Sequence, residues 1–154
     1  MPESSRAVYA RGVEQHRDPI NCACLNLRAT TRLLTRQYDE ALGGSGLLAT
    51  QHSMLNYIAM SGGCGAAEIA DFLAMDASTV TRNLRPLVSA GYVVVGAEKS
   101  DHRRRPVRIT AKGKRALESA LPQWNTAQDA VVKRLGKRRY AQLLELLSDL
   151  RGTQ

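Results

Sequence analysis

Apolar and small residues recur at helical spacing in the first part of the chain. From Asn21 to Leu42 they alternate with charged residues every three or four positions, which is typical of an amphipathic helix. The glycines at 43, 44 and 46 are placed to end it. A second helix is expected after Thr50 and ends at Ser61-Gly62-Gly63. The predicted inward stripe of the first helix contains Cys24, Leu27, Thr31, Leu34, Tyr38 and Ala41.

Two short helices and a β-hairpin are predicted next. AAEIADFLAMD forms the first helix and, after a tight turn, STVTRNLRPLVSAGY forms the second, which Asp76 or Ser78 can cap and Gly91 can end. Pro86 is expected to kink or shorten this second helix, because proline removes a backbone hydrogen bond. The period then becomes two in residues 92–95 and 106–110, which predicts a hairpin with a long tip.

The remaining chain returns to helical spacing and carries two further apolar stripes. One includes Leu117, Leu121 and Trp124, and the other includes Tyr140 and Leu147. These stripes lie outside the central module, so a dimer built on the terminal helices covers them most economically, although a monomeric bundle is also open. The predicted fold is mainly α with a small β-wing. Residues 1–20 form an N-terminal arm, 21–46 and 112–154 a helical dimerisation region, and 47–111 a winged helix-turn-helix.

The charge pattern points to a polyanionic partner. The 154-residue chain has a net charge of +8. Eight Lys and Arg residues stand against Glu98 and Asp101 between Gly96 and Arg115, a local net charge of 8 − 2 = +6. No apolar segment has the length of a membrane span or the form of a secretory signal, so the expected location is the cytoplasm.

Helix, tight turn, helix and basic hairpin together form the plan of a winged helix-turn-helix, which fits double-stranded DNA. Hydroxyl, amide and guanidinium groups at the start of the second helix can meet base edges in the major groove, and a basic hairpin can follow the backbone. A generic basic surface, or an architectural or protein-interaction module, is the alternative. The candidate base-reading residues are Ser78, Thr79, Thr81, Arg82 and Asn83, with Arg85 as a phosphate contact.

The segment MDASTVTRNLRPLVSAGYVVVGAEKSDHRRRPVRITAKG closely resembles the MarR family of bacterial transcriptional regulators. The resemblance rests on T-x-x-R at 79–82, L-x-x-x-G at 87–91, D-x-R at 101–103 and I-T-x-x-G at 109–113. It implies that Arg103 enters the minor groove, that Asp101 orients the wing arginines, and that Arg104 and Arg105 also face DNA. It further implies a homodimer on a pseudo-palindromic operator.

In this family a small aromatic or phenolic ligand commonly releases the regulator from DNA. The resemblance therefore implies a ligand-responsive repressor. The predicted ligand pocket contains Leu27, Thr31, His52 and Leu55, from the first and second helices. No phosphate-binding loop, nucleophile motif or compact metal-ligand set is present in the sequence, so we expect no enzyme activity, cofactor or metal.

The stretch NCACLNLRATTRLLTRQY also resembles the organic-hydroperoxide-sensing subset of the family. Cys24 matches its reactive cysteine and Tyr38 a tyrosine that hydrogen-bonds it, whereas Arg28 stands where a second tyrosine is usual. Arg28 and the helix N-terminus could favour a thiolate at Cys24. The alternative is a small buried residue on the dimer face. If both cysteines lie on the helix, about 200° separates Cys22 from Cys24 and they point apart.

Overall fold

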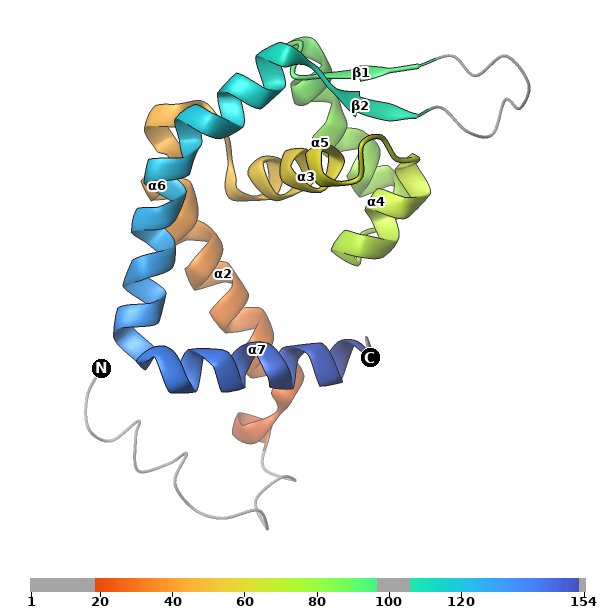
Figure 1. Ribbon diagram of the computed structural model, residues 1–154. Helices are drawn as coiled ribbons and strands as arrows, with labels where there is room; N and C mark the ends of the chain where they lie inside the picture. Colours follow the sequence, from red (N-terminus) through yellow and green to blue (C-terminus); the bar gives the residue numbers. More distant parts are fainter. Residues whose placement is uncertain (1–18, 97–105, 153–154) are drawn as a thin grey trace. The chain divides into compact units, whose positions relative to one another are not determined.

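The computed structural model describes residues 19–96 and 106–152 and divides at Gln37 and Tyr38 into two compact units (Figure 1). The predicted N-terminal arm, except its last residues, and the tip of the predicted hairpin lie outside the described residues. The protein is mainly helical with a two-stranded antiparallel sheet, which confirms the predicted fold class. No helix among the described residues is long and apolar enough to span a membrane.

The first unit contains a 3-10 helix, Pro19–Asn21, and most of α2, Ala23–Leu42. The Cys22 carbonyl accepts a hydrogen bond from the Asn26 amide at 3.1 Å, so Cys22 precedes the helix. The expectation that both cysteines lie on the helix is therefore wrong for Cys22, and the rotation of about 200° does not apply to the pair. Several apolar residues here are exposed, with Leu27 38% and Leu33 64% exposed.

The second unit begins with the last turn of α2 and a 3-10 helix, Gly43–Ser45, followed by α3, Ala49–Met60. Asp39 reaches across this turn, and its Oδ1 accepts a hydrogen bond from the Ala49 amide at 2.7 Å. A backbone donor at the start of α3 is thereby satisfied by a side chain of the preceding helix. The predicted glycine turn and second helix are both present.

Helices α4, Ala66–Leu73, and α5, Ala77–Ser89, are joined by a turn in which Ala74 is left-handed, with φ of 51°. Asp76 caps α5, as predicted. The expectation that Pro86 shortens this helix is wrong, because α5 continues to Ser89 and the Pro86 carbonyl accepts a bond from the Ala90 amide at 2.9 Å. Leu84 and Leu87, buried on either side of Pro86, hold this turn on the core.

The hairpin consists of β1, Val93–Val95, and β2, Val107–Ile109, with Val94 opposite Arg108. Strand β1 begins one residue later than predicted, and β2 is one residue shorter than predicted at each end. Cys64 forms an isolated antiparallel bridge with Val107, so the segment before α4 pairs with β2. Figure 1 shows α3, α4 and α5 grouped beside this hairpin.

The I-T-x-x-G motif joins the hairpin to α6, Ala111–Leu135. The Thr110 hydroxyl donates to the Gly91 carbonyl at 2.7 Å and accepts from the Gly113 amide at 3.0 Å. A Cβ at Gly113 would lie 2.1 Å from the Tyr92 carbonyl oxygen. The threonine thus caps the helix while the glycine permits its close approach to the strand.

Helix α7, Lys137–Arg151, follows Gly136, and both C-terminal helices expose apolar residues. Leu144, Leu146 and Leu150 are 50%, 61% and 67% exposed. The core instead lies in the central module and the facing side of α6. Its fully buried side chains are Leu42, Met54, Leu55, Ile58, Ile69, Val80, Leu87, Val93 and Val107.

Candidate nucleic-acid interface

Helix α5 presents a polar face on a buried apolar base. Val80, Leu84 and Leu87 are buried and fix the helix on α3 and α4. The predicted base-reading residues occupy the remaining surface. Ser78, Thr81, Arg82 and the predicted phosphate contact Arg85 are exposed, whereas Thr79 and Asn83 are half-buried.

A hydrogen-bond network organises the start of α5 around the Asp76 carboxylate. Oδ1 accepts bonds from the Thr79 amide at 2.7 Å and the Ser78 hydroxyl at 2.5 Å, and Oδ2 accepts one from the Thr79 hydroxyl at 2.9 Å. The Ser78 hydroxyl, followed by the Thr79 groups, holds the pKa of Asp76 far below its ordinary value. Asp76 therefore remains ionised at neutral pH.

Other polar side chains of α5 are also held by bonds within the helix. Arg82 Nη2 donates to Thr79 Oγ1 at 3.0 Å, and Asn83 Nδ2 donates to the Thr79 carbonyl at 2.9 Å. The Thr81 hydroxyl donates to the Ala77 carbonyl at 2.9 Å. Within the part of the chain that the structure describes, one bond uses the Arg82 guanidinium, which leaves most of its donors for an external partner.

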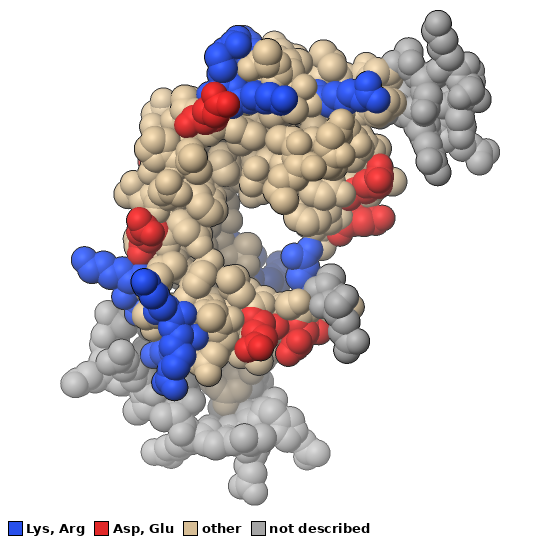
Figure 2. All heavy atoms as spheres, in the orientation of Figure 1, with Lys and Arg blue, Asp and Glu red and all other residues tan. Residues whose placement is uncertain are grey.

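The predicted wing contacts Asp101, Arg103, Arg104 and Arg105 lie outside the described residues. Next to this segment, the Gly96 amide donates a hydrogen bond to the Pro106 carbonyl at 2.8 Å and joins the described ends of the hairpin. Four further cations are exposed on β2 and the first turns of α6, where Figure 2 shows Lys and Arg side chains. Sequence reasoning counted them in the local charge but assigned them no contact. They are Arg108, Lys112, Lys114 and Arg115.

A second basic cluster surrounds the junction of α6 and α7. Figure 2 shows a separate group of Lys and Arg side chains there. The sequence of this cluster is KRLGKRR, and no contact was predicted for it. Its exposed members are Lys133, Arg134, Lys137, Arg138 and Arg139.

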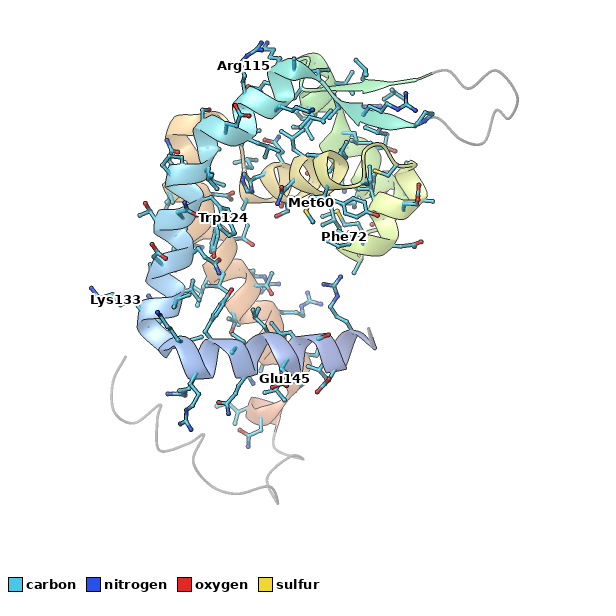
Figure 3. All side chains as sticks on the ribbon, in the orientation of Figure 1. Met60, Phe72, Arg115, Trp124, Lys133 and Glu145 are labelled. Atoms are coloured by element: carbon cyan, nitrogen blue, oxygen red, sulfur yellow. The ribbon has the colours of Figure 1, made fainter. Side chains whose placement is uncertain are left out.

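A hollow of about 240 Å³ lies between α3 and α6. Its apolar wall includes Trp124, whose position on α6 is marked in Figure 3. The Trp124 ring stacks on the His52 ring, with 6.0 Å between centroids and 17° between planes. Burial lowers the pKa of His52. The lining residues are His52, Asn56, Leu117, Glu118, Leu121 and Trp124.

Of the four residues predicted to line the ligand pocket, one lines this hollow. His52 lines the hollow, but Leu55 is fully buried in the core and is not among its lining residues. Leu27 and Thr31 belong to the first unit and are exposed. The α6 wall of the hollow, with Trp124 and Glu118, was missed because its residues follow the α3 residues by more than 60 positions in the sequence.

The residues predicted for redox sensing belong to two different units. Cys24 and Arg28 are exposed in the first unit, whereas Cys64 is buried and its thiol pKa is raised by burial. Tyr38 belongs to the second unit, where its hydroxyl donates to Gln128 Oε1 at 2.5 Å and Gln128 donates to the Tyr140 hydroxyl. Burial and the neighbouring Tyr140 raise the Tyr38 pKa. Among the residues described, no His, Cys, Asp and Glu group could hold a metal ion.

Both the sequence and the fold are similar to those of known proteins. A sequence model described as the MarR family matches residues 45–104. The structure of the transcriptional regulator MosR from M. tuberculosis in complex with DNA has a TM-score of 0.76 and 34% sequence identity, covering 85% of this chain and 94% of that chain. No curated protein sequence matches the chain.

Two more distant structures share the fold. A mutant of MarR from E. coli complexed with operator DNA has a TM-score of 0.76 and 22% identity, covering 91% of this chain and 99% of that chain. The transcriptional repressor CouR bound to p-coumaroyl-CoA has a TM-score of 0.75 and 20% identity, covering 84% and 91%. Together with the family match and the 34% identity to MosR, the fold shows that the chain belongs to the MarR family of winged-helix, DNA-binding transcriptional regulators.

Proposed function

We propose that the protein is a homodimeric repressor that places α5 in the major groove of a pseudo-palindromic operator and is released by a small aromatic ligand. The observation that carries DNA recognition is the polar face of α5, held on a buried base and ordered around Asp76. A rigid set of donors and acceptors loses little conformational entropy on binding. The basic segment between β1 and β2, which includes Arg103, supplies backbone and minor-groove contacts in this proposal. Such a regulator acts on the bacterial chromosome in the cytoplasm.

The operator can be found by selecting bound sequences from random DNA at fixed salt. We expect a short, roughly palindromic site with half-sites about one helical turn apart. Arg82→Ala should weaken operator binding by roughly 10- to 100-fold and relax the preference at one base pair. Arg139→Ala, which removes an equal exposed charge from α7, is the matched control. Coating of DNA without sequence preference would favour an architectural protein instead.

The wing contributes through charge. Arg103→Ala should weaken binding to all sequences and lower the slope of log affinity against log salt by about one. An unchanged affinity across several salt concentrations would remove the wing from the proposed interface.

The hollow beside His52 and Trp124 is the proposed ligand site. Its apolar wall and stacked rings suit a planar aromatic group, and Asn56 and neutral His52 can hydrogen-bond a hydroxyl. The chain has one tryptophan, so its fluorescence reports on this site. Phenol, 4-hydroxybenzoate and p-coumarate should be titrated, and saturable quenching should accompany operator release.

Two leucines of equal exposure make a matched pair for this site. Leu121→Phe should fill part of the hollow and abolish quenching, whereas Leu144→Phe on α7 should not. Equal quenching in both variants would place the ligand elsewhere.

An exposed thiol favours a second mode of release, by organic hydroperoxide at Cys24. Cys24 is the second residue of α2 and is exposed, as is Arg28 four residues later, so an oxidant can reach the thiol. The thiolate would attack the hydroperoxide and break its O–O bond, giving a sulfenic acid and an alkoxide that takes a proton from water to become an alcohol. Release by stoichiometric cumene hydroperoxide that disappears in Cys24→Ser supports this mode. Unaffected wild-type binding would exclude it.

A further inference from the structure

The Asp76 network determines which hydrogen-bonding groups α5 offers to DNA. A hydroxyl has one proton and two lone pairs. The Ser78 proton is directed to Asp76 Oδ1, so the exposed Ser78 oxygen retains only lone pairs for an outside partner. The Thr79 oxygen donates to Asp76, accepts from Arg82 and is half-buried. Ser78 and Asp76 together therefore form an edge that only accepts hydrogen bonds.

Base pairs differ in what they present to such an edge. In the major groove adenine offers its N6 amino group and cytosine its N4 amino group as donors, whereas guanine O6 and N7 and thymine O4 are acceptors. A lone pair facing another acceptor is repelled and leaves both groups unpaired. An ionised carboxylate beside Ser78 strengthens this repulsion.

We propose that Asp76 is a specificity-determining residue, which fixes the Ser78 hydroxyl as an acceptor and so selects adenine or cytosine at the base pair that Ser78 contacts. This inference rests on the proposed placement of α5 in the major groove. It assigns Asp76 a part in recognition in addition to its role as the helix cap. Arg82, anchored on Thr79, has the opposite polarity and pairs with an acceptor such as guanine or phosphate.

The test begins with the operator that the full-length protein selects. The base pair at which Ser78→Ala loses its preference identifies the contact. At that position the preferred base is replaced by an analogue without the amino donor, 2-aminopurine for adenine or 2-pyrimidinone for cytosine. The wild type should lose affinity about tenfold, and Ser78→Ala should not discriminate.

Asp76→Gly is the decisive variant, because glycine is tolerated at an N-cap and removes Oδ1, the atom that accepts from both the Ser78 hydroxyl and the Thr79 amide. The Ser78 proton is then free, and discrimination against guanine or thymine should fall below about threefold or reverse. Asp71→Ala on α4 removes an equal charge at an exposed carboxyl outside this network and should keep the wild-type preference. Circular dichroism and thermal unfolding establish that the variants fold.

The outcomes are separable. Wild-type preference retained in Asp76→Gly, a preference for guanine or thymine at the Ser78 position, or no position altered by Ser78→Ala would each overturn the inference. If Asp76→Gly does not fold, the loss of affinity for the analogue in the wild type and its absence in Ser78→Ala decide the matter. A wild type that selects no sequence at all would instead contradict the proposed function.

Discussion

Helices α5 and α2 are both amphipathic in sequence, yet α5 buries its apolar face, whereas α2 buries Leu42 at its end and leaves leucines of its earlier turns exposed. In α5 the inner residues Val80, Leu84 and Leu87 are 0%, 8% and 1% exposed. In α2 the inward-predicted Leu27 is 38% exposed, and Leu33 is 64% exposed. The pattern establishes a helix in both cases, but burial requires an apolar partner surface. The chain supplies that surface to α5, and we infer that a second copy supplies it to α2.

The sharpest test of this contrast compares leucines inside and outside the core. Leu55 is fully buried, whereas Leu48 is 54% exposed. Leu55→Ala should lower the free energy of unfolding by about 2–5 kcal/mol, because it leaves a cavity. Leu48→Ala should change it by less than about 0.5 kcal/mol. Urea denaturation at several protein concentrations measures both, and equal effects would contradict the assigned core.

A pair of glycines tests the packing between the hairpin and α6. Gly113→Ala should destabilise the fold by about 1–3 kcal/mol, since its Cβ would overlap the Tyr92 carbonyl. A Cβ at Gly43 meets nothing within 4 Å, so Gly43→Ala should be close to neutral. Thermal unfolding of the two variants gives the comparison. A stabilised Gly113→Ala variant would show that the strand and helix can separate at no cost.

The uncovered face of α2 can be tested through assembly. Leu33→Asp should weaken dimerisation about tenfold or more, because it places a charge on an apolar contact surface, while circular dichroism stays unchanged. Thr35→Asp introduces the same charge on the same helix but about 200° around its axis from Leu33, and serves as its control. Sedimentation over a concentration series distinguishes them. Identical dissociation constants for both variants and the wild type would place the dimer contact away from Leu33.

His52 should make the free energy of unfolding depend on pH. Burial lowers its pKa below the ordinary 6.5, so between these values the unfolded chain binds a proton that the folded chain does not. The free energy of unfolding should therefore fall as the pH drops from about 6.5 through the lowered pKa, and this step should level off below it. Denaturation of His52→Gln should lack the step. Its persistence in that variant would assign it to another group.

The smallest effect concerns thiol reactivity and leaves stability unchanged. In the folded protein a thiol reagent should modify Cys22 and Cys24 quickly, and Cys64, 3% exposed, only on unfolding. Protection of Cys24 that disappears on dilution to monomer would support its predicted burial on the dimer face. Rapid modification in the dimer would leave it available to peroxide.

The sequence by itself determined the local structure of this protein. Apolar spacing, the Asp76 cap and the glycine turns predicted the order of the helices and the hairpin, because these features act over a few residues. The same short-range patterns selected the polar face of α5 as the candidate interface. They also allowed Pro86 to shorten α5, which continues past it to Ser89 with Leu84 and Leu87 buried on either side.

Tertiary structure decided what depends on distant pairs. His52 stacks on Trp124 and leaves Leu55 in the core, Gly113 meets Tyr92 across the hairpin, and Tyr38 bonds Gln128. None of these pairings leaves a periodic signal in the sequence, because each is set by how whole elements pack. Near Cys22 the helix predicted from Asn21 began two residues too early, since the first turn is fixed by which carbonyl accepts the Asn26 amide.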